Sequence, residues 1–317
     1  MKQYVIGIDV GGTKIAYGLF DVHRKLVDKH KTLSNATLSA EEFFYKIIND
    51  IYELLGTNNL TLEDIKGIGI GMPSYVLFEE GKILMTSNLT NIANFPAKAY
   101  LMKKLGENVK IIIDNDGHTG ALAEHRHGAG RGFHHILYCP VSTGISSGII
   151  INDELFRGSY GWSGESGHMI VNPDEGIMCG CKNKGCLMSY CSGSMIVKHI
   201  LNKIELGEQT IMVELAGGKE NISAEHILKA HIMKDDMAIW AVEQMAKYIG
   251  IWCYNLYSTL NINCFIFGGG LVKFGEMLFE PVRKVFNSYN HNEFPVYFKF
   301  AELGDDFGII GAIELLF

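Results

Sequence analysis

Apolar positions in this chain fall into short continuous runs that alternate with longer stretches of helical spacing. Residues 4–10 and 15–20 are two such runs, and the Gly-Gly-Thr turn between them predicts a β-hairpin. Residues 66–72 and 109–113 are mostly apolar and β-branched, which predicts two buried strands. Because strands and helical segments alternate, the pattern predicts an α/β fold.

Helical spacing is clearest after Ser39, where Glu42 stands three residues further on and completes a capping-box pattern. The apolar residues that follow recur every three or four positions: Phe43, Phe44, Ile47, Ile48, Ile51, Leu54 and Leu55. Further helices are predicted over residues 237–260, over residues 275–289 and in the closing apolar segment GIIGAIELLF.

A second strand–turn–strand pattern, ILYCPVSTGISSGIII at residues 136–151, mirrors the one at the start of the chain. Two similar units suggest a duplicated fold in which each half opens with a hairpin. A length of 317 residues favours two domains, since a single hydrophobic core rarely organises so long a chain. We expect the domain boundary near residue 115, before the helical stretch that follows Asp116.

Composition excludes several classes of function. Hydrophobic residues make up 47% of the chain and the net charge is −7 without a basic block, so nucleic acid is not an expected partner. No apolar stretch reaches the length of about 18 residues that a membrane helix needs. The N-terminal segment has no signal-peptide pattern, and we expect a soluble, cytoplasmic protein.

The seven cysteines are distributed unevenly. Cys179, Cys181 and Cys186 lie close together among polar residues and glycines, and His168 precedes them. Three thiolates and one imidazole complete the tetrahedral shell of a structural zinc ion. Three coincidental core cysteines are the weaker alternative, because their neighbours are not apolar. The same ligand count excludes a zinc hydrolase, since four protein ligands leave no position for an activated water.

The turn of the first hairpin carries the segment Asp9-Val10-Gly11-Gly12-Thr13-Lys14. Glycines at such a turn expose backbone N–H groups that can bind phosphate oxygens, with a hydroxyl from Thr13 and a positive charge from Lys14. Asp9 could hold Mg²⁺ through water. A plain tight hairpin is an equally good interpretation of these residues alone.

Asn115 and Asp116 follow a predicted strand and open a predicted helix. An aspartate at a helix N-terminus is a common cap, and on two residues that interpretation is favoured. The functional alternative is a general base that accepts the proton of a sugar hydroxyl during phosphoryl transfer. Further along, Glu165 precedes His168 with the spacing of one helical turn, and its carboxylate could accept hydrogen bonds from vicinal hydroxyls.

Together these motifs resemble the ROK family of sugar kinases and sugar-responsive repressors, in particular its zinc-containing branch of glucokinase-like and N-acetylmannosamine kinase-like enzymes. The resemblance implies an actin-like, ribonuclease H-like duplicated fold in which residues 1–115 and about 305–317 form the smaller domain and residues 116–304 the larger. It implies ATP with Mg²⁺, transfer to a hexose hydroxyl, usually at C6, and a homodimer. The residues that the resemblance assigns to the sugar are Asn88, Asn115, Asp116 (the catalytic base), Glu165 and His168. Those that it assigns to ATP and its phosphates are Asp9, Gly11, Gly12, Thr13, Lys14, Thr143, Gly144, Gly148 and Gly268, Gly269 and Gly270.

Two departures from the family pattern bear on function. Three glycines of the second phosphate motif are Ser142, Ser146 and Ser147 here, and each gains a Cβ atom where backbone approaches phosphate. Position 188 is Met where the family carries a glutamate that touches the sugar, so a change in sugar preference is expected. These departures motivate the alternative of a catalytically weak or inactive sugar-binding regulator. The repressor branch is disfavoured by a chain that starts at its first strand.

Overall fold

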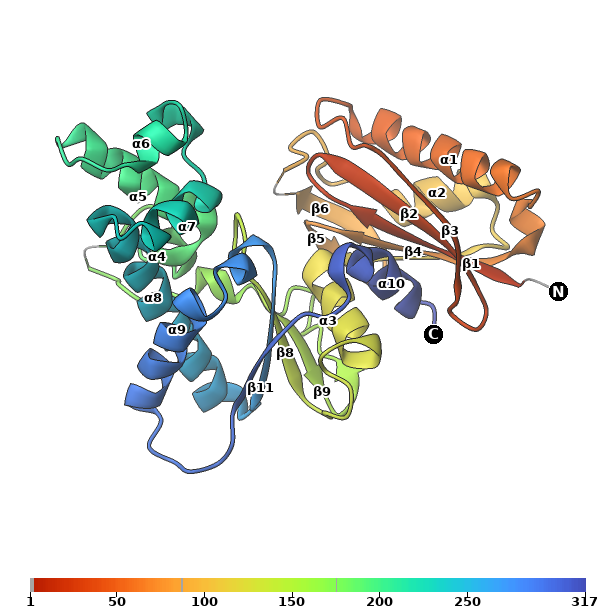
Figure 1. The fold of residues 1–317 in the computed structure, drawn as a ribbon. Helices are drawn as coiled ribbons and strands as arrows, with labels where there is room; N and C mark the ends of the chain where they lie inside the picture. Colours follow the sequence, from red (N-terminus) through yellow and green to blue (C-terminus); the bar gives the residue numbers. More distant parts are fainter. Residues whose placement is uncertain (1–2, 87, 175) are drawn as a thin grey trace. The chain divides into compact units, whose positions relative to one another are not determined.

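The computed structural model describes residues 3–86, 88–174 and 176–317 (Figure 1). Its contacts divide the chain into two compact units. Unit 1 comprises residues 1–134, 148–164 and 301–317, and unit 2 comprises residues 135–147 and 165–300.

The sheet of unit 1 has five strands in the order β3-β2-β1-β4-β7. Their bounds are β1 Tyr4–Val10, β2 Lys14–Asp21, β3 Leu26–Leu33, β4 Ile65–Met72 and β7 Lys110–Asn115. β1 pairs antiparallel with β2, which confirms the predicted hairpin, and β1, β4 and β7 run parallel. Their carboxyl ends therefore meet at one edge of the sheet.

Helices cover both faces of this sheet. On one face, α1 (Ala40–Thr57) and α2 (Ala97–Leu105) join a large core around Ile6, Ile8 and Ile68. Ser39 caps α1 and forms the predicted capping box with Glu42. On the other face α10 (Phe307–Glu314) lies against β1 and β4, as Figure 1 shows.

The close approach of α10 explains two strand glycines. A Cβ atom at Gly69 would lie 1.8 Å from Ala312 O, and one at Gly7 would lie 2.2 Å from Ile309 O. Any larger residue would push the helix away from the sheet. Unit 1 also contains the hairpin β5 (Ser74–Leu77) and β6 (Lys82–Thr86), helix α3 (Asp116–His127), and the short strands β9 (Gly148–Ile151) and β10 (Glu154–Leu155).

The contact-based division differs from the predicted boundary at residue 115. Helix α3 packs on α10, β9 and the strands of unit 1, and so groups with that unit together with residues 148–164. The sequence pattern placed the boundary at the start of α3 because a strand ends there. It contains no signal for the tertiary packing of α3 against the C-terminal helix.

Unit 2 repeats the parallel arrangement. Its strands β8 (Ile136–Pro140), β11 (Cys264–Gly268) and β12 (Tyr297–Phe300) pair in parallel, with β11 between the other two. Its helices are α4 Met188–Cys191, α5 Gly193–Glu205, α6 Met212–Leu215, α7 Ala224–Ile232, α8 Asp236–Leu260 and α9 Glu276–Tyr289. The long pair α8 and α9 packs together and agrees with the predicted helices.

Five short 3₁₀ turns complete the described elements: Leu62–Asp64, Ser166–His168, Lys219–Asn221, Gly270–Phe274 and Gly304–Asp306. Each half of the chain thus opens with a strand that later pairs in parallel with a following strand, as expected for a duplicated fold. Among the described residues, no helix has both the length and the apolar character that crossing a membrane requires.

Candidate active site

Two aspartates meet at the carboxyl edge of the sheet in unit 1. The register aligns Asp9 with Gly71 and Gly71 with Asp114, so Asp9 and the start of α3 lie at the same edge. Burial raises the pKa of Asp9 to about 7; the negative charge of Asp116 adds to this shift and Lys31 opposes it. Burial also raises the pKa of Asp116, against the N–H of Gly117 and the charge of His118. The strand register and the effect of the Asp116 charge on Asp9 agree that both carboxyl groups lie at this edge of the sheet.

The capping role predicted for this segment belongs to Asn115. Its Oδ1 accepts from Gly117 N at 2.7 Å and its Nδ2 donates to Ser74 O at 3.1 Å. Asp116 is the first residue of α3, and its Oδ1 accepts from the same N–H at 2.9 Å. Because Asn115 provides the cap, the carboxylate of Asp116 is not needed for that purpose.

The turn of the first hairpin lies beside this edge of the sheet. Gly11 N donates to Lys14 O at 2.9 Å, and Ser34 Oγ donates to Gly12 O at 2.8 Å. A Cβ atom at Gly12 would lie only 3.2 Å from Asn88 Cβ, so this glycine leaves space for the predicted sugar residue. The side chains of Thr13 and Lys14 are exposed.

A glycine of α10 makes room for Asp9 itself. A Cβ atom at Gly308, in the first turn of that helix, would lie 2.2 Å from Asp9 Cγ. The aspartate therefore packs against the backbone of the helix N-terminus, where the helix dipole favours negative charge. This contact could not be predicted from local patterns, because the two residues stand at opposite ends of the chain.

A buried ion cluster beside Asp116 was missed by the sequence interpretation. Asp114 is fully buried and binds His118 Nδ1 through Oδ1 at 2.7 Å and Arg157 Nε through Oδ2 at 2.8 Å. Burial raises the pKa of Asp114, but His118 and Arg157 outweigh it and hold that pKa below its usual value. The one available signal was a charged residue at the end of the otherwise apolar strand KIIID.

The four predicted zinc ligands come together in unit 2. One candidate ligand atom from each of His168, Cys179, Cys181 and Cys186 lies within 4.8 Å of the others. Cys179 Sγ lies 3.6 Å from His168 Nδ1, and the sulfurs of Cys181 and Cys186 are 3.5 Å apart. A tetrahedral zinc ion with bonds of about 2.0–2.3 Å requires ligand separations of about 3.3–3.8 Å. The donor set and these two separations therefore suit a tetrahedral zinc ion.

Only one of the two glycines between Cys179 and Cys186 is required by the backbone of this cluster. Gly185 has a φ of +78°, and a Cβ atom there would lie 1.9 Å from Asn172 O, so a glycine is required. Gly180, in contrast, has open space where a Cβ atom would lie. A second residue of this segment with a positive φ is Lys182, at 71°. Burial raises the pKa of the Cys179 thiol, but hydrogen bonds led by the backbone of Cys181 lower it to about 7.

Glu165 and His168 lie on one side of the 3₁₀ turn Ser166–His168, as their spacing predicts. Glu165 Oε2 is 4.0 Å from His168 Nε2. Because His168 Nδ1 faces Cys179, its Nε2 faces away from the cysteine cluster and toward Glu165. One imidazole can therefore bind a metal on one side and a polar ligand on the other.

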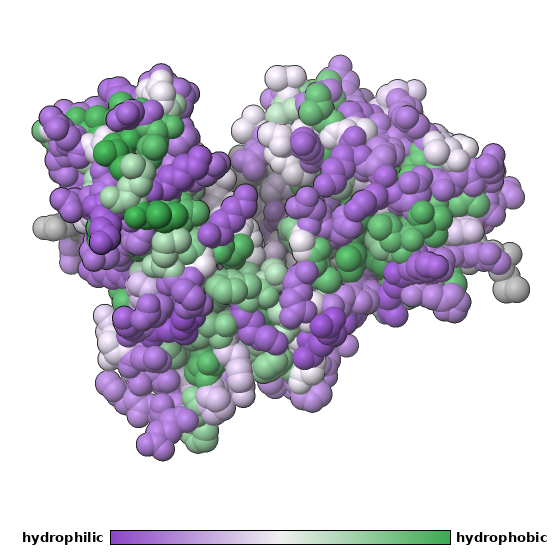
Figure 2. Space-filling view, viewed as in Figure 1, coloured by the Kyte–Doolittle hydropathy of each residue, from purple (hydrophilic) through white to green (hydrophobic). Residues whose placement is uncertain are grey.

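The second predicted phosphate motif lines a large pocket of unit 2. The pocket has a volume of about 860 Å³. Ser142, Thr143 and Gly270 line one side of it, and apolar residues of α5 and α7 such as Val197 and Leu228 line another. Figure 2 shows apolar surface over the region of α5 to α7. The glycine run follows β11, and a Cβ atom at Gly269, whose φ is +86°, would lie 2.6 Å from Val141 O.

Comparisons with known proteins agree with this architecture. The crystal structure of a ROK family glucokinase from Streptomyces griseus, in complex with glucose and AMPPNP, matches 98% of both chains with a TM-score of 0.81 and 28% identity. The fold is thus the actin-like, two-domain α/β fold of the ROK sugar kinases.

The chain belongs to the ROK family, whose model matches residues 5–317. A glucokinase from Halalkalibacterium halodurans is 29% identical over 98% of this chain and 93% of its own length. A xylose repressor from Caldicellulosiruptor bescii is 27% identical over 98% of this chain and 77% of its own length.

Proposed function

We propose that this chain transfers a phosphoryl group from ATP to a hydroxyl of a hexose or N-acetylhexosamine, most simply at C6, with Asp116 as the general base. The coarser part, that the chain is an ATP-dependent sugar kinase, is supported by its match to glucokinases over almost the whole length of both chains. The finer part is supported by the geometry of unit 1.

The observation that carries the proposal is the position of Asp116, which begins α3 at the sheet edge where Asp9 also lies. Asn115 supplies the cap of α3, which leaves the Asp116 carboxylate for another purpose. An aspartate acts as a general base more effectively when its pKa lies nearer the working pH than that of a free aspartate. Burial shifts the pKa of Asp116 in this direction, upward from its ordinary value. Asp9 would hold Mg²⁺ through water, and the metal would neutralise charge on the transferred phosphoryl group.

The remaining residues divide between the two units. In unit 1, Gly11, Gly12, Thr13 and Lys14 would contact phosphate, and Asn88 and Asn115 would contact sugar. In unit 2, Glu165 and His168 would contact sugar. There, Thr143 and Gly270 line a pocket whose volume suits a nucleotide, and we propose that Gly144, Gly268 and Gly269 contact the nucleotide beside them.

A zinc ion bound by His168, Cys179, Cys181 and Cys186 would be structural, since four protein ligands fill its shell. It would hold the Nε2 side of His168 in place beside Glu165. A homodimer stays a prediction.

A sugar-binding regulator with weak or no catalysis is the second candidate. It is favoured by the match to xylose repressors and by the serines of the second phosphate motif. This candidate predicts sugar binding without magnesium-dependent ATP binding.

An ADP-release assay over a sugar panel tests the proposal. The panel contains glucose, fructose, mannose, allose, N-acetylglucosamine and N-acetylmannosamine, each with and without Mg²⁺. We expect magnesium-dependent ADP release with at least one member. If none supports turnover while titration calorimetry detects sugar binding, the regulator is correct and the kinase proposal is wrong.

A further inference from the structure

The hydrogen bonds of His118 fix its charge. Its Nδ1 lies 2.7 Å from Asp114 Oδ1, and its Nε2 lies 3.1 Å from the carbonyl oxygen of Ser163. A carbonyl oxygen carries no hydrogen, so Nε2 must donate. Asp114 is ionised, because it also accepts from Arg157 and Asn115 N, so Nδ1 must donate as well. An imidazole that donates from both nitrogens is an imidazolium cation.

This cation is buried where a neutral histidine would be expected. The side chain of His118 is 1% exposed, and that of Asp114 is 0% exposed. Burial lowers the pKa of His118, but the hydrogen bond and negative charge of Asp114 outweigh it and raise that pKa. A buried charge persists only when it is paired and hydrogen-bonded, and His118 meets both conditions.

His118 stands two residues after Asp116 in the first turn of α3. Its positive charge lowers the pKa of the Asp116 carboxyl group, against the effect of burial. The charged groups that act on this turn are Asp114 of β7, Asp116 of α3, Asp9 of β1 and Arg157 of the segment after β10.

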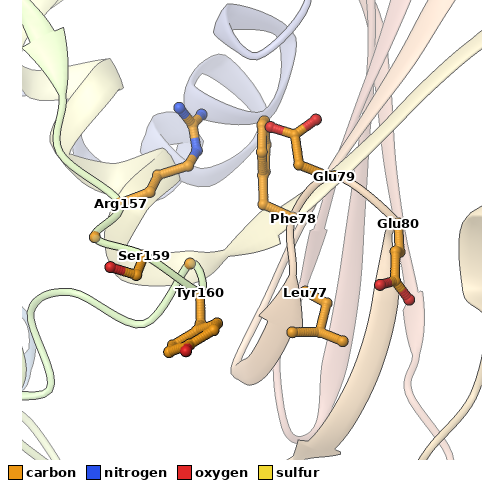
Figure 3. Close-up of a pocket in the computed structure, with 9 residues that line it drawn as sticks. Leu77, Phe78, Glu79, Glu80, Arg157, Ser159 and Tyr160 are labelled. Atoms are coloured by element: carbon orange, nitrogen blue, oxygen red, sulfur yellow. The ribbon is translucent and has the colours of Figure 1, made fainter.

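The same cluster ties a distant segment to the start of α3. Arg157 binds Asp114, and the carbonyl of Ser163 binds His118, so residues 157–163 are held at both ends. The Arg157 guanidinium also stacks on the Phe78 ring, with its Cζ 3.8 Å from the ring centroid. Figure 3 shows these two side chains next to each other at a cavity of about 230 Å³ in unit 1.

We infer that His118 is a positioning residue for Asp116: as an imidazolium held between Asp114 and Ser163 O, it fixes the first turn of α3 and places a positive charge two residues from the base. This inference rests on the proposed role of Asp116. His118 has no free ring nitrogen with which to bind a substrate, because both nitrogens are already hydrogen-bonded. Its effect on the reaction therefore passes through Asp116.

The variant His118→Gln tests the inference through the pH profile of kcat/KM at saturating ATP. Loss of the cation raises the pKa of Asp116, so the acid limb of the profile should move up by about one pH unit. At pH 6 kcat should fall about tenfold, with a smaller loss at pH 9 and an almost unchanged KM for the sugar. His125→Gln, near the other end of α3, is the matched control and should keep the wild-type acid limb.

An acid limb that stays in place in a folded His118→Gln protein would overturn the inference and show a purely structural role. A second measurement needs no variant. The ring ¹⁵N shifts of His118 in the wild-type protein should report both nitrogens protonated at pH 7, and a neutral ring would overturn it. The control Asp116→Asn separates the two proposals: if that variant remains active, the assignment of the base fails, whatever the result for His118.

Discussion

The two loops proposed to bind phosphate are held in different ways. In unit 1, the turn at residues 11–14 is fixed by the pairing of β1 with β2, two strands adjacent in sequence. In unit 2, residues 142–147 are fixed by a segment further along the chain. Gly193 N donates to Ser142 O at 2.8 Å, Ser194 Oγ donates to Thr143 O at 2.7 Å, and Ser147 Oγ lies 2.9 Å from Ser166 Oγ.

The segment that supports the second loop also contains the proposed zinc ligands. A Cβ atom at Gly167, next to His168, would lie 2.1 Å from Ile145 O, so the zinc segment packs directly on the loop. The methyl group of Met188 lies 3.6 Å from the Cβ position of Gly144. The first loop is therefore held mainly by its own hairpin and by Ser34 just after β3, whereas the second depends on the segment that carries the proposed zinc ligands.

The largest difference should follow from loss of zinc. Cys186→Ser removes a buried ligand, and we expect less than one zinc per chain and a rise of at least tenfold in the KM for ATP. The matched control is Cys264→Ala, which removes a thiol from β11 and should retain zinc. Metal analysis and steady-state kinetics measure both. A zinc-free Cys186→Ser protein with an unchanged KM for ATP would show that the second loop does not need the metal.

Alanine in place of one glycine in each loop should give a smaller difference, and here the substitution in the first loop should have the larger effect. Gly12→Ala forces Asn88 to move and should raise the KM for the sugar about tenfold, because a side chain placed to bind loses its position. Gly144→Ala has room for its methyl group and should change that KM by less than threefold. Steady-state kinetics gives the KM for the sugar of both variants. Equal changes in the two KM values would contradict the described packing.

Asp9 should make unfolding depend on pH. Its pKa is about 7 in the folded chain and 3.8 as the ordinary value, so the folded state binds the extra proton between these pH values. Stability contributed by that proton is present below pH 4 and is lost as pH rises through 7. Asp9→Asn should therefore be about 4 kcal/mol more stable than wild type at pH 8 and no more stable at pH 4.

Urea unfolding at the two pH values measures this difference. Asp21→Asn, at the end of β2, provides the control on the same sheet. A stability difference of Asp9→Asn that is the same at both pH values would show that Asp9 titrates normally.

The smallest effect concerns the hydrogen bond between the side chains of Ser147, in the second loop, and Ser166, outside it. Ser147→Ala removes a buried hydrogen-bond partner of Ser166 and should lower the free energy of unfolding by about 1 kcal/mol. Ser146→Ala, in the same loop and partly exposed, should change it by less than half of that. Thermal unfolding compares the two, and an equal loss would mean that the serine pair does not stabilise the loop.

Local patterns explain what the sequence could predict. The hairpin of β1 and β2, the capping box at Ser39 and the clustering of His168 with three cysteines all depend on residues close together in the chain, and the structure contains each of them. Within the buried cluster, Asp114 and His118 are four residues apart, but the contact between Arg157 and Asp114 spans 43 residues. No spacing rule marks that second contact, and only the fold brings the segment after β10 to the start of α3.

The packing of α3 with unit 1 could not be predicted from the sequence either, because it too depends on residues far apart in the chain. Gly311 of α10 would place a Cβ atom 1.9 Å from Thr119 O, a contact between helices far apart in sequence. A strand end next to a helix start looked like a domain boundary, whereas the C-terminal helix holds α3 in unit 1.

The most direct test of the central claim is the turnover of Asp116→Asn with a sugar that the wild-type protein phosphorylates. We expect kcat to fall by about 10³-fold, within the range that a general base contributes, while the sugar Kd from titration calorimetry changes less than threefold. An Asp116→Asn protein that keeps more than a tenth of the wild-type kcat would contradict the assignment of Asp116 as the base.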